Sequence, residues 1–183
     1  MTEMRRVALK TGVTLNVAIA GDPGQPAVIL LHGFPESHRT WREIVPRLQD
    51  RFYLVMPDQR GFAGSDQPQD VADYKTDKLI DDVFALADAL GLAEFSLVGH
   101  DWGGAIAWPT AMRGDPRVKR CVGSLQSQCL MAARQVPTAL EKTFGPAVRD
   151  VESAINHIAD FSIGGMRSIT FAQAFQFFST ARP

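Results

Sequence analysis

Asp101 is the residue whose type and position in this 183-residue sequence most directly suggest chemistry. It lies at the centre of Gly99-His100-Asp101-Trp102-Gly103, between an apolar run at 95–98 and a small-residue stretch at 103–107. A nucleophile with a glycine two residues away on each side is typical of a sharp turn from a strand into a helix. The glycines let strand and helix approach closely, while the central residue takes a strained backbone conformation. We therefore expect the side chain of Asp101 to point out above a sheet, with a helix N-terminus behind it.

An aspartate at the tip of such a turn, where serine is the usual residue, suits attack on a saturated carbon. Aspartate carboxylates have a reference pKa of about 3.9, so they are ionised at neutral pH and need no base to activate them. Attack by Asp101 would open an epoxide or displace a halide, and it would leave an ester on the side chain. A second step must hydrolyse that ester with water activated by a base, and this step passes through an oxyanion. The backbone N–H of Trp102, directly after the nucleophile, is an expected oxyanion donor.

The elements that must position Asp101 alternate between strands and helices. A capping box at Thr40-Trp41-Arg42-Glu43 indicates where the first helix begins. The alternation predicts an α/β fold with a mostly parallel sheet, helices on both faces and an N-terminal hairpin. The loops that begin at His32, Asp58 and Asp101 then share the carboxyl edge of the sheet, where such folds bind ligands. The expected strands are 5–10 and 13–20 (the hairpin), 27–31, 52–56, 95–98 and 118–125, and the expected helices are 40–50, 76–90 and 103–113.

The hydrophobic pattern changes near residue 126 and divides the chain into two parts. Residues 1–125 form the expected α/β core, which includes the turn at Asp101. In residues 126–183, apolar side chains such as Val136, Leu140 and Phe144 recur at intervals of three and four residues. This spacing predicts a helical tail that does not continue the sheet.

The composition excludes several classes of partner. The formal net charge is −1 and there is no run of Lys and Arg, so neither nucleic acid nor an anionic membrane is expected as a partner. We expect neither a signal peptide nor a membrane-spanning segment. Cys121 and Cys129 lack metal-ligand spacing, so we expect two reduced thiols in a cytoplasmic protein. No metal or organic cofactor is expected, because water and side chains suffice for the reaction.

Three loop motifs resemble those of the α/β-hydrolase superfamily, and within it the group of epoxide hydrolases and haloalkane dehalogenases. They are His32-Gly33-Phe34-Pro35-Glu36, the loop from Asp58 to Asp66, and the stretch from Gly99 to Gly104. The resemblance implies that Asp101 is the nucleophile and that the backbone N–H groups of Phe34 and Trp102 form the oxyanion hole. Phe34 favours an epoxide hydrolase, because many haloalkane dehalogenases carry Asn at this position. The implied substrate is a small apolar organic molecule, an epoxide or a haloalkane.

Structural roles are expected for the remaining motif residues. His32 and His100 should fix loops through side-chain hydrogen bonds. Asp58 and Asp66 should hold their own loop, and His38 is expected at the surface. The small or rigid residues that shape the turns are Gly33, Pro35, Gly99 and Gly103.

The resemblance also implies parts that this sequence does not supply in the expected form. In complete members the acid and the catalytic His follow a helical lid, whereas the histidine after Asp101 in this chain is His157, expected at the surface of the tail. Lid tyrosines protonate the epoxide oxygen in that group, but Tyr53 and Tyr74 both precede the turn. Pro109 falls inside an expected helix, and Gly123 weakens the last expected strand.

Three accounts of the chain and three of its function stay open. The chain could be a fragment of a longer hydrolase, a natural truncation or frameshift product, or a protein that completes its sheet as a homodimer along the open edge. It could open epoxides, displace halide from haloalkanes, or be a non-catalytic hydrolase-like module that binds a small ligand or a partner chain. Epoxide opening through Asp101 is the first hypothesis.

Overall fold

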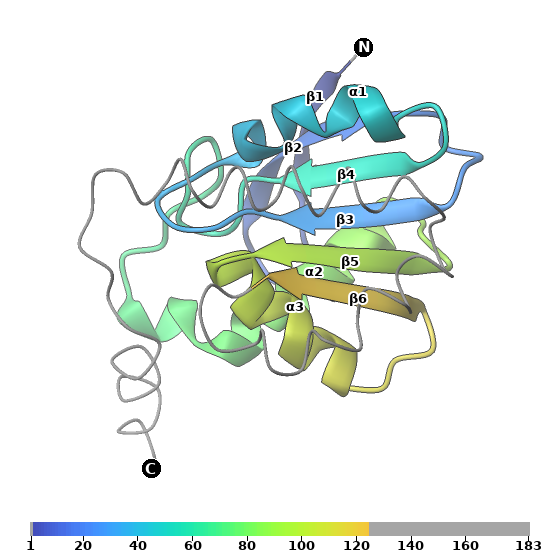
Figure 1. Cartoon of the computed structure of the whole chain (residues 1–183). Coiled ribbons are helices and arrows are strands. Elements are labelled where there is room, and N and C mark those ends of the chain that lie inside the picture. Colours follow the sequence, from blue (N-terminus) through green and yellow to red (C-terminus); the bar gives the residue numbers. More distant parts are fainter. Residues whose placement is uncertain (1, 125–183) are drawn as a thin grey trace. The chain divides into compact units, whose positions relative to one another are not determined.

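The computed structural model describes residues 2–124, which form a six-stranded sheet flanked by helices (Figure 1). The strand order is β1-β2-β4-β3-β5-β6. β1 and β2 form an antiparallel hairpin, β2 also pairs antiparallel with β4, and the other neighbours are parallel. The predicted α/β fold with a mostly parallel sheet and an N-terminal hairpin is therefore confirmed. The strands are β1 (Glu3–Ala8), β2 (Thr14–Ala20), β3 (Ala27–Leu31), β4 (Tyr53–Pro57), β5 (Phe95–His100) and β6 (Val118–Ser124).

Helices cover both faces of the sheet because apolar side chains alternate along buried strands. Ile29 and Leu31 of β3 belong to the core that also contains side chains of α2 and α3. Val28 and Leu30 are equally buried but point to the opposite face, where η1 contacts β3 and β4. In Figure 1, α1 lies in front of the sheet and α2 behind it. The helices are η1 (His38–Glu43), α1 (Val45–Leu48), η2 (Val71–Tyr74), α2 (Thr76–Ala89) and α3 (Trp102–Met112), with η1 and η2 of the 3₁₀ type.

The prediction of one continuous helix over 40–50, opened by a capping box at Thr40, is wrong. The capping residue is Ser37, whose Oγ accepts a hydrogen bond from Arg39 N–H at 3.3 Å. It opens η1, and the separate helix α1 follows with Pro46 in its first turn. Pro46 has no N–H to continue the hydrogen bonds of η1, but its fixed backbone angle suits the start of a new helix.

The helix after the turn at Asp101 runs from Trp102 to Met112 and continues through Pro109. Pro109 cannot donate to the Ala105 carbonyl, as its sequence position implies. The next residue, Thr110, is buried, and its hydroxyl donates to the Ile106 carbonyl at 2.7 Å. Pro109 therefore removes one backbone hydrogen bond without ending α3.

Several predictions concern residues beyond the described range. The helical tail over 126–183, with Cys129 and His157, lies outside residues 2–124. Within that range β6 is the last strand on its side of the sheet, so the predicted homodimer along this edge stays a prediction. Within it, too, no helix has the length and apolar character needed to cross a membrane.

Candidate active site

Asp101 lies at the junction between β5 and α3, at the tip of a strand-to-helix turn. Its backbone angles are φ 52° and ψ −117°, in the left-handed half of backbone space that residues with side chains avoid. Such a conformation costs about 1–3 kcal/mol and persists only where the surroundings impose it. Asp101 is also the N-cap residue of α3, and its carbonyl accepts the N–H of Ala105 at 3.1 Å. The side chain therefore stands at the positive end of the helix dipole.

Glycines on both sides of Asp101 make this turn sterically feasible. A Cβ atom on Gly99 would lie 2.3 Å from the Gly103 carbonyl oxygen. A Cβ atom on Gly103 would lie 2.0 Å from the Leu31 carbonyl oxygen, because α3 begins directly against the end of β3. Both contacts are with backbone, which cannot move aside as a flexible side chain can. The two motif glycines are thus required by close approach, as their spacing predicts.

The loop after β3 reaches the carboxylate of Asp101. The backbone N–H of Phe34 donates a hydrogen bond to Oδ1 of Asp101 at 2.9 Å. Gly33 packs so closely that a Cβ atom there would lie 2.7 Å from Cβ of Asp101. The peptide bond between Phe34 and Pro35 is cis. Phe34 and Trp102, whose backbones flank Asp101, are 56% and 38% exposed.

His32 joins the loop after β3 to the loop after β4. Its Nε2 atom accepts the backbone N–H of Gln59 at 3.0 Å, and its Nδ1 atom lies 2.8 Å from the Gly33 carbonyl oxygen. An Nε2 atom that accepts requires the proton on Nδ1, so Nδ1 donates to Gly33. Burial lowers the pKa of the imidazole, which favours this neutral form. The Gln59 side chain returns a hydrogen bond of 2.6 Å to the His32 carbonyl. These are the contacts that the predicted structural role of His32 requires.

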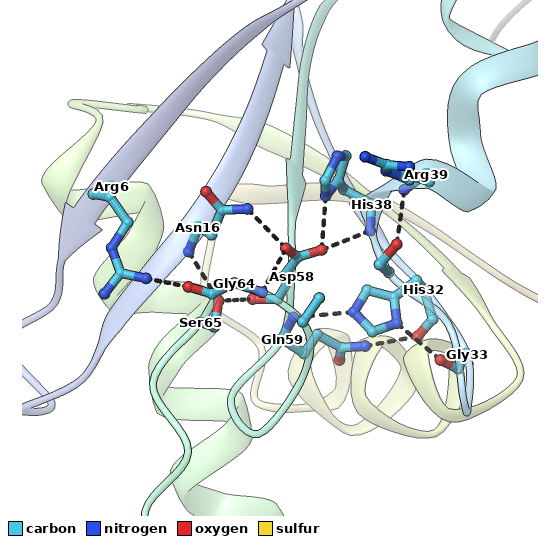
Figure 2. A network of polar contacts seen from close by, with 12 residues as sticks. Arg6, Asn16, His32, Gly33, His38, Arg39, Asp58, Gln59, Gly64 and Ser65 are labelled. Atoms are coloured by element: carbon cyan, nitrogen blue, oxygen red, sulfur yellow. Dashed lines mark hydrogen bonds and ion pairs between the residues drawn. The ribbon is translucent and has the colours of Figure 1, made fainter.

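Asp58 is the centre of a second polar network, shown in Figure 2. Its side chain is fully buried, and its Oδ2 atom accepts hydrogen bonds from the Asn16 amide at 2.8 Å and from Gly64 N–H at 3.2 Å. The other oxygen, Oδ1, accepts both the backbone N–H and Nδ1 of His38, each at 2.8 Å. Burial alone would raise the pKa of the Asp58 carboxyl, but these hydrogen bonds outweigh it and lower the pKa below its usual value.

The expectation that His38 is a surface residue is wrong. Its side chain is 19% exposed and is held against the buried carboxylate of Asp58. This pair has no local signature in the sequence, because 20 positions separate its members and the ends of β3 and β4 bring them together. Asp66, expected to hold its own loop, instead joins that loop to the N-terminal hairpin: its Oδ2 atom accepts Thr14 N–H at 2.8 Å and its Oδ1 atom accepts a hydrogen bond from Arg6 at 2.9 Å.

His100 lies directly before Asp101 and is buried, with 4% of its surface exposed. Its Nε2 atom is 3.9 Å from Oε1 of Glu36, and among residues 2–124 its Nδ1 atom has no hydrogen-bond partner. The other carboxylate oxygen of Glu36 accepts the N–H of Gly33 at 2.9 Å. Among residues 2–124, the side-chain hydrogen bonds expected of His100 are therefore not formed, and it meets the loop after β3 only at this distance from Glu36.

Comparison with known proteins identifies the family. The model of the alpha/beta hydrolase fold family matches residues 26–155, which include β3, the turn at Asp101 and α3. The chain belongs to this family. Epoxide hydrolase A of Mycobacterium tuberculosis is similar, with 40% identity over 142 residues, which are 76% of this chain and 44% of that protein.

Solved structures that are similar to this chain are also described as epoxide hydrolases. A structure described among novel epoxide hydrolases from metagenomes of hot environments is 54% identical, with a TM-score of 0.64, over 66% of this chain and 41% of that one. Epoxide hydrolase A of Mycobacterium thermoresistibile is 33% identical, with a TM-score of 0.64, over 74% of this chain and 45% of that one. The chain thus spans less than half the length of these relatives.

Proposed function

We propose that this hydrolase-fold chain opens epoxides through Asp101. A carboxylate oxygen of Asp101 attacks a ring carbon of the epoxide, the bond between that carbon and the ring oxygen breaks, and the ring oxygen takes up a proton. The result is a hydroxyalkyl ester on Asp101. The observation that carries this proposal is the strained tip position of Asp101 together with the hydrogen bond from Phe34 N–H to Oδ1. That hydrogen bond orients one oxygen of the carboxylate and leaves Oδ2 as the proposed attacking atom.

In the second half of the proposed reaction, water adds to the carbonyl carbon of the ester. The negative charge develops on Oδ1, which Phe34 N–H already contacts. Trp102, the first residue of α3, is the proposed second donor through its backbone N–H. Loss of one such donor typically costs about 10²–10³ in rate. Collapse of the oxyanion releases the diol and restores the Asp101 carboxylate.

The proton donor and the water-activating base are not assigned to the described part of the chain. His32 and His38 are held in loop contacts, and His100 is buried against Glu36. Tyr74 donates its hydroxyl proton to the Pro68 carbonyl at 2.8 Å. Residues 2–124 therefore supply two of the proposed roles: the carboxylate that attacks the epoxide and the N–H groups that stabilise the oxyanion.

The proposed substrate is a small apolar epoxide. The similar proteins named above are called epoxide hydrolases. Phe34, which contacts Asp101 through its backbone N–H, is exposed and apolar, and it carries no side-chain amide that could bind a departing halide. This favours epoxide opening over halide displacement, which stays the second candidate.

Parallel incubations with an aryl epoxide and with a chloroalkane test this proposal. We expect the epoxide to add its whole mass to the protein, or to be converted to diol, and the chloroalkane to release no chloride. Asp101→Asn should abolish the epoxide reaction, whereas Asp22→Asn, in a surface loop, should not. Chloride release without epoxide opening would replace the proposal by a dehalogenase. No reaction with either compound, together with ligand binding that ignores Asp101→Asn, would replace it by a binding module.

A further inference from the structure

We infer that Glu36 is a positioning residue, which directs the backbone N–H of Phe34 at the Asp101 carboxylate. The inference rests on the proposed function of Asp101 for its catalytic meaning, but the geometry stands by itself. Oε2 of Glu36 accepts the N–H of Gly33 at 2.9 Å. The backbone N–H of Glu36 donates to the Gly33 carbonyl at 3.1 Å. Glu36 therefore holds Gly33 from both sides.

These two hydrogen bonds restrain the two peptide groups that meet at Gly33, and the group with the Gly33 carbonyl also carries the Phe34 N–H. The Gly33 carbonyl and the Phe34 N–H belong to the same planar peptide unit, so fixing the carbonyl direction fixes the N–H direction. Glycine allows wide rotation about its backbone bonds, and a side chain at Gly33 is excluded by its contact with Asp101. The Gly33 carbonyl is held by the backbone N–H of Glu36 at 3.1 Å and by Nδ1 of His32 at 2.8 Å. The side chain of Glu36 adds the restraint on Gly33 N–H, which limits rotation about the backbone bonds of Gly33.

Glu36 also lies next to the turn that contains Asp101. Its side chain is 13% exposed, and its Oε1 atom lies 3.9 Å from Nε2 of the buried His100. His100 and Asp101 are consecutive residues. The turn thus contacts the loop after β3 at two points, through His100 and Glu36 on one side and through Asp101 and Phe34 on the other.

Positioning requires a hydrogen-bond acceptor at Glu36 and not its negative charge. A Cβ atom on Gly33 would lie 2.9 Å from Oδ1 of Asp101 and 3.1 Å from Oε2 of Glu36, so the two carboxylates are near neighbours. Two negative charges this close oppose each other and also oppose an oxyanion on Asp101. A glutamine at this position keeps an acceptor for Gly33 N–H and removes the charge, so Glu36→Gln separates the two contributions.

The test follows the amide resonance of Phe34 in ¹⁵N–¹H spectra of the full chain. Asp101→Asn should shift this resonance in the wild-type background and in the Glu36→Gln background, because Phe34 N–H contacts the side chain in both. In the Glu36→Ala background the same substitution should shift the resonance less, because the restraint on Gly33 N–H is lost while the hydrogen bonds to the Gly33 carbonyl remain. Glu43→Ala, which removes an exposed carboxylate at the end of η1, is the matched control and should behave as wild type. If Glu36→Ala does not fold, Glu36→Met removes the acceptor while keeping the length of the side chain.

An equal response of Phe34 to Asp101→Asn with and without the Glu36 carboxylate would overturn the inference. This readout needs no substrate, so it stays distinct from failure of the proposed function. Where the ester on Asp101 forms, Glu36→Ala should also slow its hydrolysis by roughly tenfold, a fraction of the 10²–10³ expected for loss of a whole donor. Glu36→Gln should restore the wild-type rate or exceed it.

Discussion

The backbone N–H of Phe34 donates a hydrogen bond to Oδ1 of Asp101 across 67 positions of sequence. The parallel pairing of β3 with β5 makes this contact, because Leu31 and Gly99 are partners at the ends of the two strands. The residues that follow them leave the sheet at the same edge. The candidate oxyanion donor and the candidate nucleophile are therefore placed by sheet register, and the glycines of the turn keep α3 close enough to preserve it.

Gly103→Ala should destabilise the protein by about 3 kcal/mol or more, beyond the usual range for overpacking, because the new Cβ atom meets backbone. The nearest atom, the Leu31 carbonyl oxygen, would be 2.0 Å away. Urea denaturation measures the change. Gly24→Ala is the control, because its nearest neighbour would be a side-chain oxygen of Asp22 at 3.3 Å, and it should change stability by less than about 0.5 kcal/mol. Equal stabilities of the two variants would contradict the close approach of α3 to β3.

The buried ion pair between Arg60 and Asp82 should be costly to break. Its side chains are 3% and 6% exposed, and two hydrogen bonds of 2.7 Å join the guanidinium to both carboxylate oxygens. Asp82→Ala leaves a buried, unpaired charge and should lower the free energy of unfolding by about 3–5 kcal/mol. Replacing both residues together, as Arg60→Met with Asp82→Leu, should recover most of this loss.

The control for that prediction is the exposed pair of Lys119 and Glu94, joined at 2.7 Å. Glu94→Ala should cost less than about 1 kcal/mol, because solvent screens the pair. Denaturant unfolding of all variants at neutral pH supplies the comparison. A cost for Asp82→Ala no larger than that for Glu94→Ala would show that the pair does not contribute as its burial indicates.

Asp58 should contribute to acid unfolding. Its pKa in the folded protein is lowered, because hydrogen bonds from Asn16, His38 and Gly64 outweigh the effect of burial. The unfolded value is about 3.9, so the contribution is complete above that pH and is lost as the pH falls through the folded value. Asp58→Asn should therefore reduce stability at neutral pH and flatten the fall in stability below about pH 4. Asp50→Asn, at an exposed position, should keep the wild-type slope, and a wild-type slope in Asp58→Asn would refute this assignment.

The thiol of Cys121 should react slowly with thiol reagents. Burial raises its pKa to about 11, so little thiolate is present at mildly alkaline pH. In a Cys129→Ser background, Ellman's reagent should modify Cys121 at least about tenfold more slowly in the folded protein than in denaturant. Equal rates in the two states would show that the Cys121 thiol is accessible and ionises normally.

The fold and the strand-to-helix turn at Asp101 could be predicted from the sequence because both depend on local patterns. Continuous apolar runs gave the buried strands, and the spacing of Gly99 and Gly103 around Asp101 gave the turn. The helix over 76–90 was predicted from its apolar face, and α2 ends one residue earlier, at Ala89. Gly91, the expected capping glycine, has a φ of 65°. In each case neighbours in the sequence are also neighbours in space.

The polar pairs around the site could not be predicted, because their members meet only when the sheet forms. His38 with Asp58, Arg60 with Asp82 and His100 with Glu36 join different loops or helices. The sequence does indicate that Asp82 is buried. It lies three positions after Leu79 and four before Leu86, which places this acidic residue on the apolar face of α2. The first helix was misplaced for a local reason, since the capping pattern at Thr40 outweighed the competing cap at Ser37 and the break at Pro46.

The most direct test of the central claim, that Asp101 is a carboxylate nucleophile, is a peptide mass map of the full chain after treatment with an aryl epoxide. We expect one added epoxide mass on the peptide that contains Asp101, released by mild base, and no such mass in Asp101→Asn. Rapid turnover can keep the ester from accumulating, so acid quenching at short times belongs to the measurement. Labelling that persists in Asp101→Asn, or diol formed by that variant at the wild-type rate, would contradict the account.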